Sequence, residues 1–170
     1  MDGRRKVTHI LVVEDNPDHT ELMAEAFAES SSSNQVHFVA DGQSALAFAR
    51  QEGHYASAPQ PHLIILDLNL PGMPGDDVLR QLKAAPATAH IPVIIVTTST
   101  APDDVRLAYE HQAAAFVTKP LRYGDFLDTI RAVDAFWFRF VHYVRPLDAH
   151  IVIPSRNDYP ANPQPPRRSL

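Results

Sequence analysis

Hydrophobic residues along the chain gather into short unbroken runs, separated by longer segments of mixed character. Strands covered on both faces show such runs, whereas a half-exposed strand alternates apolar and polar residues. The runs are also rich in β-branched residues, which favour strands. They predict five strands, over Thr8–Val13, Gln35–Val39, His62–Leu66, Pro92–Val96 and Ala115–Val117.

The segments between these runs carry apolar residues at helical spacing. Asn16 is expected to cap the first helix and Pro17 to be its first residue, because these residue types favour those positions. Asp41-Gly42 is expected to form a turn. Alternating strands and helices predict an α/β fold, a doubly wound five-stranded parallel sheet with helices on both faces. The later helices are predicted over about residues 43–50, around Val78–Leu82, from Pro102, and over about residues 125–144.

The sequence changes character after Val144. Residues 145–170 contain six prolines and few residues that a core would bury. Such segments are typically extended or disordered. We therefore expect a folded domain over residues 1–144 and a Pro-rich C-terminal extension over residues 145–170, partly disordered or docked on a second subunit.

The composition excludes several classes of function. The 170 residues suffice for one domain, and the absence of cysteine rules out disulfides, zinc–thiolate sites and cysteine nucleophiles. A net charge of -5 argues against a general nucleic-acid binder. No apolar run is long enough to span a membrane, and the run that follows the basic residues 4–6 is too short for a signal peptide. A cytoplasmic protein is expected.

Polar side chains follow four of the predicted strands at their carboxyl ends. Asp67 ends the third run, and Glu14 and Asp15 follow the first. Thr97 follows the fourth run, and Lys119 lies just beyond the fifth. Because the carboxyl ends of parallel strands meet at one edge of the sheet, these groups are expected to converge in one crevice.

Three carboxylates in one crevice repel each other unless a cation lies between them. Mg²⁺, or Mn²⁺, prefers such oxygen ligands, and we expect it to be held by Glu14, Asp15, Asp67 and the backbone carbonyl of Asn69. A carboxylate can attack phosphorus and form an acyl phosphate. Asp67 would be that nucleophile, with Lys119 and Thr97 holding the phosphoryl oxygens. Singly, each residue also fits a structural role as a helix cap, a turn former or a strand end.

The stretches "VVEDN", "LIILDLNLPGMPG", "VIIVTTS" and "AFVTKP" resemble the successive motifs of the response-regulator receiver domains of two-component signalling, over about residues 7–135. The resemblance implies a flavodoxin-like receiver fold and a phosphoacceptor signalling protein rather than an enzyme. It implies that Asp67 takes a phosphoryl group from a sensor histidine kinase. Thr97 and Phe116 would be the residues that switch conformation.

Three positions depart from that family's pattern. Glu14 stands where aspartate is commoner, and Thr98 stands where the family usually has a smaller residue. Gln112 stands where glycine is frequent before the fifth strand. None of these changes removes a reacting group.

The stretch "DAFWFRFVHYV" and the extension after it are similar to the response regulators paired with bacterial and cyanobacterial phytochrome kinases. The resemblance implies a phytochrome-type kinase as partner. The 26 residues after Val144 are too few for a helix-turn-helix module, so direct contact with nucleic acid is not expected.

The last predicted helix carries more apolar surface than one sheet face can cover. A continuous apolar stripe accompanies further apolar residues off that stripe, which is typical of a partner surface. We expect a homodimer. The alternative is that the extension folds back over this surface. The residues assigned to the dimer contact are Phe136, Trp137, Phe140, Val141 and Val144.

Other functions fit parts of this pattern. A receiver-like binding module that works without phosphorylation would be expected to have lost one of Asp67, Thr97 and Lys119. An aspartyl-nucleophile phosphatase needs an acid two residues after the nucleophile, where this chain has Asn69. A nucleotide-binding module needs a Gly-rich loop after a strand, and none follows. The nine histidines lack metal-ligand spacing and are expected to be incidental surface residues.

Overall fold

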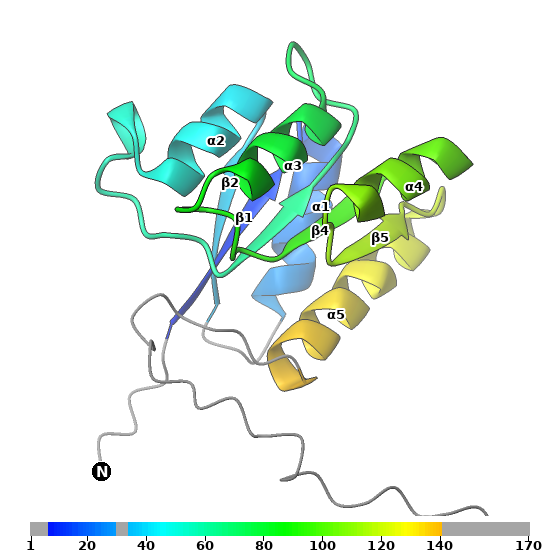
Figure 1. Ribbon diagram of the computed structural model, residues 1–170. Helices are drawn as coiled ribbons and strands as arrows, with labels where there is room; N and C mark the ends of the chain where they lie inside the picture. Colours follow the sequence, from blue (N-terminus) through cyan, green and yellow to red (C-terminus); the bar gives the residue numbers. More distant parts are fainter. Residues whose placement is uncertain (1–6, 30–33, 141–170) are drawn as a thin grey trace, which may run out of the picture.

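The computed structural model describes residues 7–29 and 34–140, and of residues 138–140 the backbone alone. Five strands and five helices alternate along this part of the chain (Figure 1). The strands are β1 (Thr8–Val13), β2 (Asn34–Val39), β3 (Leu63–Leu66), β4 (Val93–Thr97) and β5 (Ala115–Thr118). The helices are α1 (Pro17–Ala28), α2 (Gly42–Arg50), α3 (Gly75–Ala84), α4 (Pro102–Glu110) and α5 (Tyr123–Phe140), with a short 3₁₀ helix, η1, at Gly53–Tyr55.

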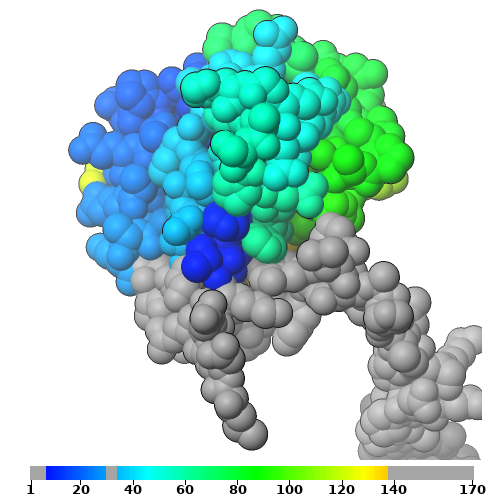
Figure 2. Space-filling view, turned by 90° about the vertical axis from the view of Figure 1, so that its left-hand side faces the viewer, coloured from blue at the N-terminus to red at the C-terminus, as the bar shows by residue number. Residues whose placement is uncertain are grey.

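The strands form one parallel sheet in the order β2-β1-β3-β4-β5, which confirms the predicted doubly wound fold. Helices α1 and α5 cover one face, and α2, α3 and α4 cover the other (Figure 1). In the space-filling view, α2 and the segment after it face the viewer, and α2 packs beside α3 on this face of the sheet (Figure 2). The order of the strands places β1 and β3 at the centre, where their carboxyl ends are flanked on both sides.

Side chains of the central strands point alternately into two separate cores. Ile10 and Val12 pack with α1 and α5, whereas Leu11 and Val13 pack with α2 and α3. All four are almost completely buried, which explains why the sequence shows an unbroken apolar run. A fully buried aliphatic side chain contributes about 1.5–3 kcal/mol, so these two cores hold the strand ends rigidly.

Two helix starts follow from capping residues. The side chain of Asn16 accepts a hydrogen bond from the Asp18 backbone N–H at 2.9 Å, so α1 begins at Pro17 as predicted. Asp41 was expected in a turn with Gly42, but it caps α2 by accepting from the Ser44 N–H at 2.8 Å. Gly42 is thus the first residue of α2.

The ends of several elements differ from the predictions by one or two residues. Thr97 is the last residue of β4 rather than the residue after it, and α5 begins at Tyr123. The expected end of the last helix at Val144 and the domain boundary after it lie outside the described residues. Within residues 7–29 and 34–140, no helix combines the length and apolar character that a membrane span requires.

Candidate functional site

The carboxyl ends of β1 and β3 bring Glu14 and Asp67 together. Hydrogen bonds continue the sheet one residue past each strand: the Glu14 N–H donates to the Val39 carbonyl at 3.0 Å, and the Asp67 N–H donates to the Val13 carbonyl at 3.1 Å. Both acidic residues are almost fully buried. Their backbones are therefore fixed by the sheet, and their side chains lie at its edge.

Lys119 bridges the two acids. Its Nζ donates to Oδ2 of Asp67 at 2.5 Å and also to Oε2 of Glu14. The lysine side chain is 2% exposed, and the two carboxylates compensate its buried charge. The Lys119 N–H donates to the Thr97 carbonyl at 2.7 Å, which ties the lysine to the end of β4.

Asp15 completes an acidic cluster with Glu14 and Asp67. One carboxylate oxygen from each residue lies within 4.8 Å of the others. Three carboxylates face the single ammonium of Lys119, so two negative charges are left uncompensated, and a divalent cation would neutralise them. Asp15 is exposed, which leaves a side where water can complete a coordination sphere. Oxygen donors of this kind suit a divalent cation such as Mg²⁺ or Mn²⁺.

Asn69 connects the acid to the end of β4. Its backbone N–H donates to Oδ1 of Asp67 at 3.0 Å. Its side-chain amide donates to the hydroxyl oxygens of Thr97 at 3.4 Å and Thr98 at 3.3 Å. Thr97 is fully buried and Thr98 is exposed, so the amide lies across the mouth of the site.

Gly75 is a site residue that the sequence did not reveal. A Cβ at this position would lie 2.1 Å from the Asp67 carbonyl oxygen and 2.7 Å from Cα of Leu68. The Gly75 N–H donates to the Leu68 carbonyl at 2.9 Å. The start of α3 thus packs directly against the backbone that carries Asp67, which only glycine permits.

His19 is the second site residue that the sequence did not reveal. Its Nδ1 lies 3.1 Å from Nζ of Lys119 and 3.6 Å from Oε1 of Glu14. His19 lies on α1. The other site residues were predicted because the carboxyl ends of parallel strands meet at one edge of the sheet, and that argument does not apply to a residue on a helix. The only available signal was its place in the first turn of the helix that follows Glu14 and Asp15.

Comparison with known proteins identifies this arrangement. The sequence matches the response regulator receiver domain over residues 10–131. This chain belongs to that family. Receiver domains of response regulators are signalling proteins rather than classical enzymes, and this one is related to phytochrome response regulators.

Three comparisons give the extent of the likeness. Response regulator Rcp1 of Synechocystis sp. is 36% identical over 132 residues, which are 78% of this chain and 90% of Rcp1. The crystal structure of the Mn²⁺-bound form of Rcp1 superposes with a TM-score of 0.79 at 35% identity, covering 81% of this chain and 99% of that one. The structure of the phosphorylated cyanobacterial phytochrome response regulator RcpA gives 0.80 at 35% identity, covering 82% and 100%.

Phe116 lies on β5 of the receiver, beside α4. Its ring packs partly against the core that α2 and α3 cover, and its backbone N–H donates to the hydroxyl of Tyr109 at 3.3 Å. Tyr109 is half exposed. The predicted switch residues Thr97 and Phe116 therefore belong to neighbouring strands, with α4 packed on the second.

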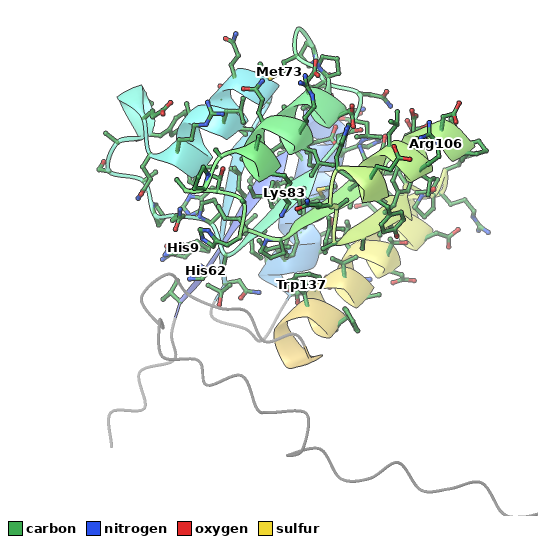
Figure 3. The ribbon with its side chains drawn as sticks, viewed as in Figure 1. His9, His62, Met73, Lys83, Arg106 and Trp137 are labelled. Atoms are coloured by element: carbon green, nitrogen blue, oxygen red, sulfur yellow. The ribbon has the colours of Figure 1, made fainter. Side chains whose placement is uncertain are left out.

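The structure separates two of the five residues expected at a dimer contact. Trp137 is 7% exposed and packs into the core beneath α1 and α5 (Figure 3). Phe136, one position earlier, is 57% exposed. Trp137 thus belongs to the core of its own chain, whereas Phe136 is largely exposed to solvent. The side chain of Phe140, and residues Val141 and Val144, lie outside the described residues.

Three of the histidines lie together, contrary to the expectation of incidental surface residues. His9 and His62 lie at the end of the sheet opposite the acidic cluster (Figure 3). The His9 N–H donates to Nδ1 of His62 at 3.0 Å, and Nδ1 of His9 lies 3.2 Å from Nε2 of His37. Burial, together with the charge of His37, lowers the pKa of His9, and burial lowers that of His37.

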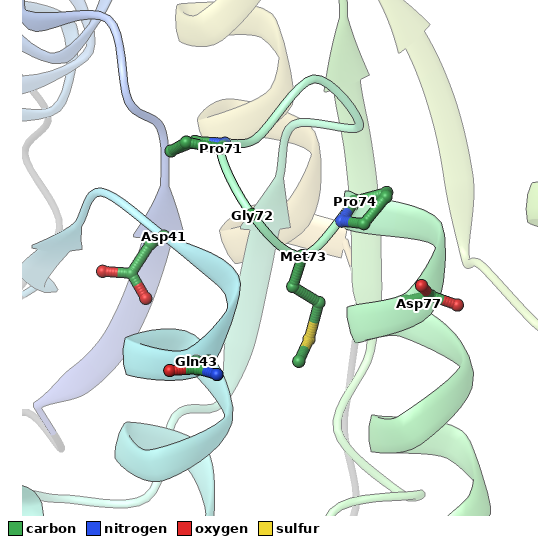
Figure 4. Close-up of a pocket in the computed structure, with 7 residues that line it drawn as sticks. All are labelled: Asp41, Gln43, Pro71, Gly72, Met73, Pro74 and Asp77. Carbon is green, nitrogen blue, oxygen red and sulfur yellow. The ribbon is translucent and has the colours of Figure 1, made fainter.

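A groove of about 620 Å³ lies on the outer side of the loop between β3 and α3 (Figure 4). The start of α2 forms its other wall, and none of Glu14, Asp15 and Asp67 lines it. The lining residues are Asp41, Gln43, Pro71, Gly72, Met73, Pro74 and Asp77.

Proposed function

We propose that this receiver accepts a phosphoryl group on Asp67 from a sensor histidine kinase. The observation that carries the proposal is the contact of Asp67 with Lys119 inside a cluster of three carboxylates. A buried carboxylate paired with an ammonium and open to a divalent cation is equipped to attack phosphorus and to neutralise the charge that the transfer brings.

The proposed transfer forms a bond between a carboxylate oxygen of Asp67 and phosphorus. It breaks the bond between phosphorus and the imidazole nitrogen of the kinase's phosphohistidine. The Asn69 N–H holds Oδ1 of Asp67, which fixes the orientation of the carboxylate. Lys119 donates to one phosphoryl oxygen and the Thr97 hydroxyl to another. Mg²⁺ or Mn²⁺, held by Glu14, Asp15, Asp67 and the Asn69 carbonyl, would neutralise further charge on the phosphoryl group.

The same step supplies a switch. Thr97 Oγ1 now accepts hydrogen bonds from the Asn69 amide and the Ser99 N–H, both at 3.4 Å. Donating to a phosphoryl oxygen requires this hydroxyl to turn toward Asp67. We propose that the turn draws the segment after β4 with it and repacks Phe116 against α4, so that α4, β5 and α5 carry the signal.

We propose a phytochrome-type kinase as the donor. The likeness to RcpA and Rcp1 over most of the chain supports this assignment, because RcpA is a phytochrome response regulator. We also propose that the protein works as a homodimer through the end of α5, without direct contact with nucleic acid. Exposed Phe136 is the described residue that supports the dimer.

Incubation with Mg²⁺ and phosphoramidate, followed by intact-protein mass spectrometry, tests the proposal. One covalent phosphate is expected, and none in the Asp67→Asn variant, whose neutral amide is a poor nucleophile of nearly the same shape. Omitting the metal should prevent the adduct in the native protein.

Two other results would favour other functions. A folded protein that never gains the phosphate would be a receiver-like module that works without phosphorylation. Steady hydrolysis of p-nitrophenyl phosphate would revive the phosphatase alternative, in which the site turns over rather than stores the phosphoryl group.

A further inference from the structure

His19 lies on α1, on the helix side of Lys119. Its Nδ1 is 3.1 Å from the lysine Nζ, and its ring centroid is 5.4 Å from that of Phe126 on α5. The histidine side chain is 29% exposed, whereas Phe126 is buried. The ring is therefore held between two helices, with one edge toward the lysine.

The Lys119 ammonium needs three hydrogen-bond acceptors, and His19 is placed to be the third. An ammonium has three N–H donors and no acceptor. Glu14 and Asp67 accept two of these hydrogen bonds, and His19 is placed to accept the third through the lone pair of Nδ1. Since the lysine is almost completely buried, an unpaired N–H would be costly.

The backbone around His19 is itself fixed. Asn16 caps α1 three residues earlier, and its N–H donates to Oε1 of Glu14 at 3.0 Å. Thr20, next along the helix, donates through its hydroxyl to the Asn16 carbonyl at 3.1 Å. These contacts fix the first turn of α1, and the first turn places the His19 ring next to the acidic cluster.

We propose that His19 is a positioning residue for phosphoryl acceptance. The imidazole accepts a hydrogen bond from one N–H of the Lys119 ammonium. This contact holds the ammonium in place while its other two N–H groups turn from the carboxylates of Glu14 and Asp67 toward a phosphoryl oxygen. Without this third partner, the ammonium would spend part of its time away from Asp67. This inference rests on the function proposed above and assigns a role to a residue outside the strand ends.

Three variants separate the effect of the hydrogen-bond acceptor from the effect of the size of the ring. In His19→Asn, Oδ1 occupies a position close to that of Nδ1 and can accept from Lys119. His19→Leu has similar branching but no acceptor. His19→Ala also lacks the acceptor and is less bulky, so a defect shared by the Leu and Ala variants reports the missing hydrogen bond rather than a misfit.

The lysine itself provides a readout that does not depend on phosphorylation. The chain has three lysines, Lys6, Lys83 and Lys119, so a ¹⁵N–¹H spectrum of lysine ammonium groups is simple to assign. Lys83 donates to the carbonyls of Ala89 and Ile91 at 3.0 and 2.6 Å and serves as an internal control. A slowly exchanging Lys119 signal is expected in the native protein and His19→Asn, and its loss in His19→Leu and His19→Ala, with the Lys83 signal unchanged.

The rate of phosphorylation by phosphoramidate and Mg²⁺ is the second readout. It should fall about tenfold in His19→Leu, the size expected when a charged group loses one hydrogen bond, and by less than about twofold in His19→Asn. Native values of both readouts in folded His19→Leu and His19→Ala would overturn the inference. If the native protein shows the Lys119 signal but never gains a phosphate, the proposed function fails, and with it the phosphoryl role of His19.

Discussion

The absence of a Cβ at Gly75 allows the start of α3 to pack against the backbone of Asp67, the proposed phosphoacceptor. Gly75 packs so closely on Asp67 that a Cβ there would meet the aspartate carbonyl at 2.1 Å. We predict that Gly75→Ala lowers the free energy of unfolding by about 1–3 kcal/mol, because the start of α3 and Asp67 must move apart. Gly124→Ala is the matched control. Its Cβ would meet nothing within 4 Å, and alanine in a helix should raise stability by about 0.5–1 kcal/mol. Urea unfolding of both variants measures the difference, and equal stabilities would contradict the close contact.

Lys119 is both a structural counter-ion and a phosphoryl ligand. In Lys119→Ala, Glu14 and Asp67 face each other without the ammonium, so we predict that Mg²⁺ binds at least as tightly as to the native protein. The conformational response to phosphorylation should be lost, because the phosphoryl oxygen has no lysine partner. Calorimetric titration with Mg²⁺ and NMR spectra of the region around Thr97 and Phe116 measure the two effects. Weaker metal binding together with a native response would refute this division of roles.

At the scale of elements, His9 near the start of β1 and His37 within β2 form a pH-sensitive pair. Folding lowers the pKa of His9 and of His37 from 6.5, so the unfolded chain binds protons more readily. The stability that this pair contributes is complete above the unfolded pKa and is lost as the pH falls through the folded pKa. We predict that the free energy of unfolding decreases between about pH 7.5 and about pH 5.5, and that His37→Gln reduces the decrease. The exposed His54→Gln is the control; equal pH profiles for the native protein and His37→Gln would contradict the prediction.

The elements also show what the sequence could predict. The five strands and the convergence of Glu14, Asp67, Thr97 and Lys119 followed from apolar runs and from the rule that parallel strands end at one edge. Gly75 and His19 could not be found this way, because their roles depend on how a helix start approaches the sheet. The predictions that Asp41 forms a turn and that Trp137 lies at a dimer contact differ from the structure for a related reason.

Those two errors share a cause. A local pattern does not distinguish an Asp-Gly turn from a helix cap followed by a close helix contact. A Cβ on Gly42 would meet Val78 of α3 at 2.6 Å, a contact that only the assembled fold shows. Likewise, the apolar residues at the end of α5 could face the core or a partner. The structure assigns Trp137 to the core and leaves Phe136 on the surface.

At the scale of the whole molecule, the exposed Phe136 on α5 predicts self-association. We expect sedimentation equilibrium to show a dimer for the full chain, weakened in Phe136→Ser, because this side chain offers apolar surface beside the described core. Tyr123→Ser, at the exposed start of the same helix, is the control and should remain dimeric. Truncation after Arg139 should weaken the dimer if the extension contributes. A native protein that stays monomeric at tens of micromolar would end the dimer proposal.

The central claim is that the phosphoryl group resides on Asp67, and chemical trapping tests it most directly. Borohydride reduces an aspartyl phosphate to homoserine, so the modified residue can be located by peptide mass spectrometry after treatment with phosphoramidate and Mg²⁺. We predict homoserine at position 67, no homoserine at position 15, and no 5-hydroxynorvaline, the alcohol that a reduced glutamate gives, at position 14, although all three carboxylates lie in the same cluster. Unmodified Asp67 alongside a reduced residue elsewhere, or no reduced residue in a folded protein, would contradict the account.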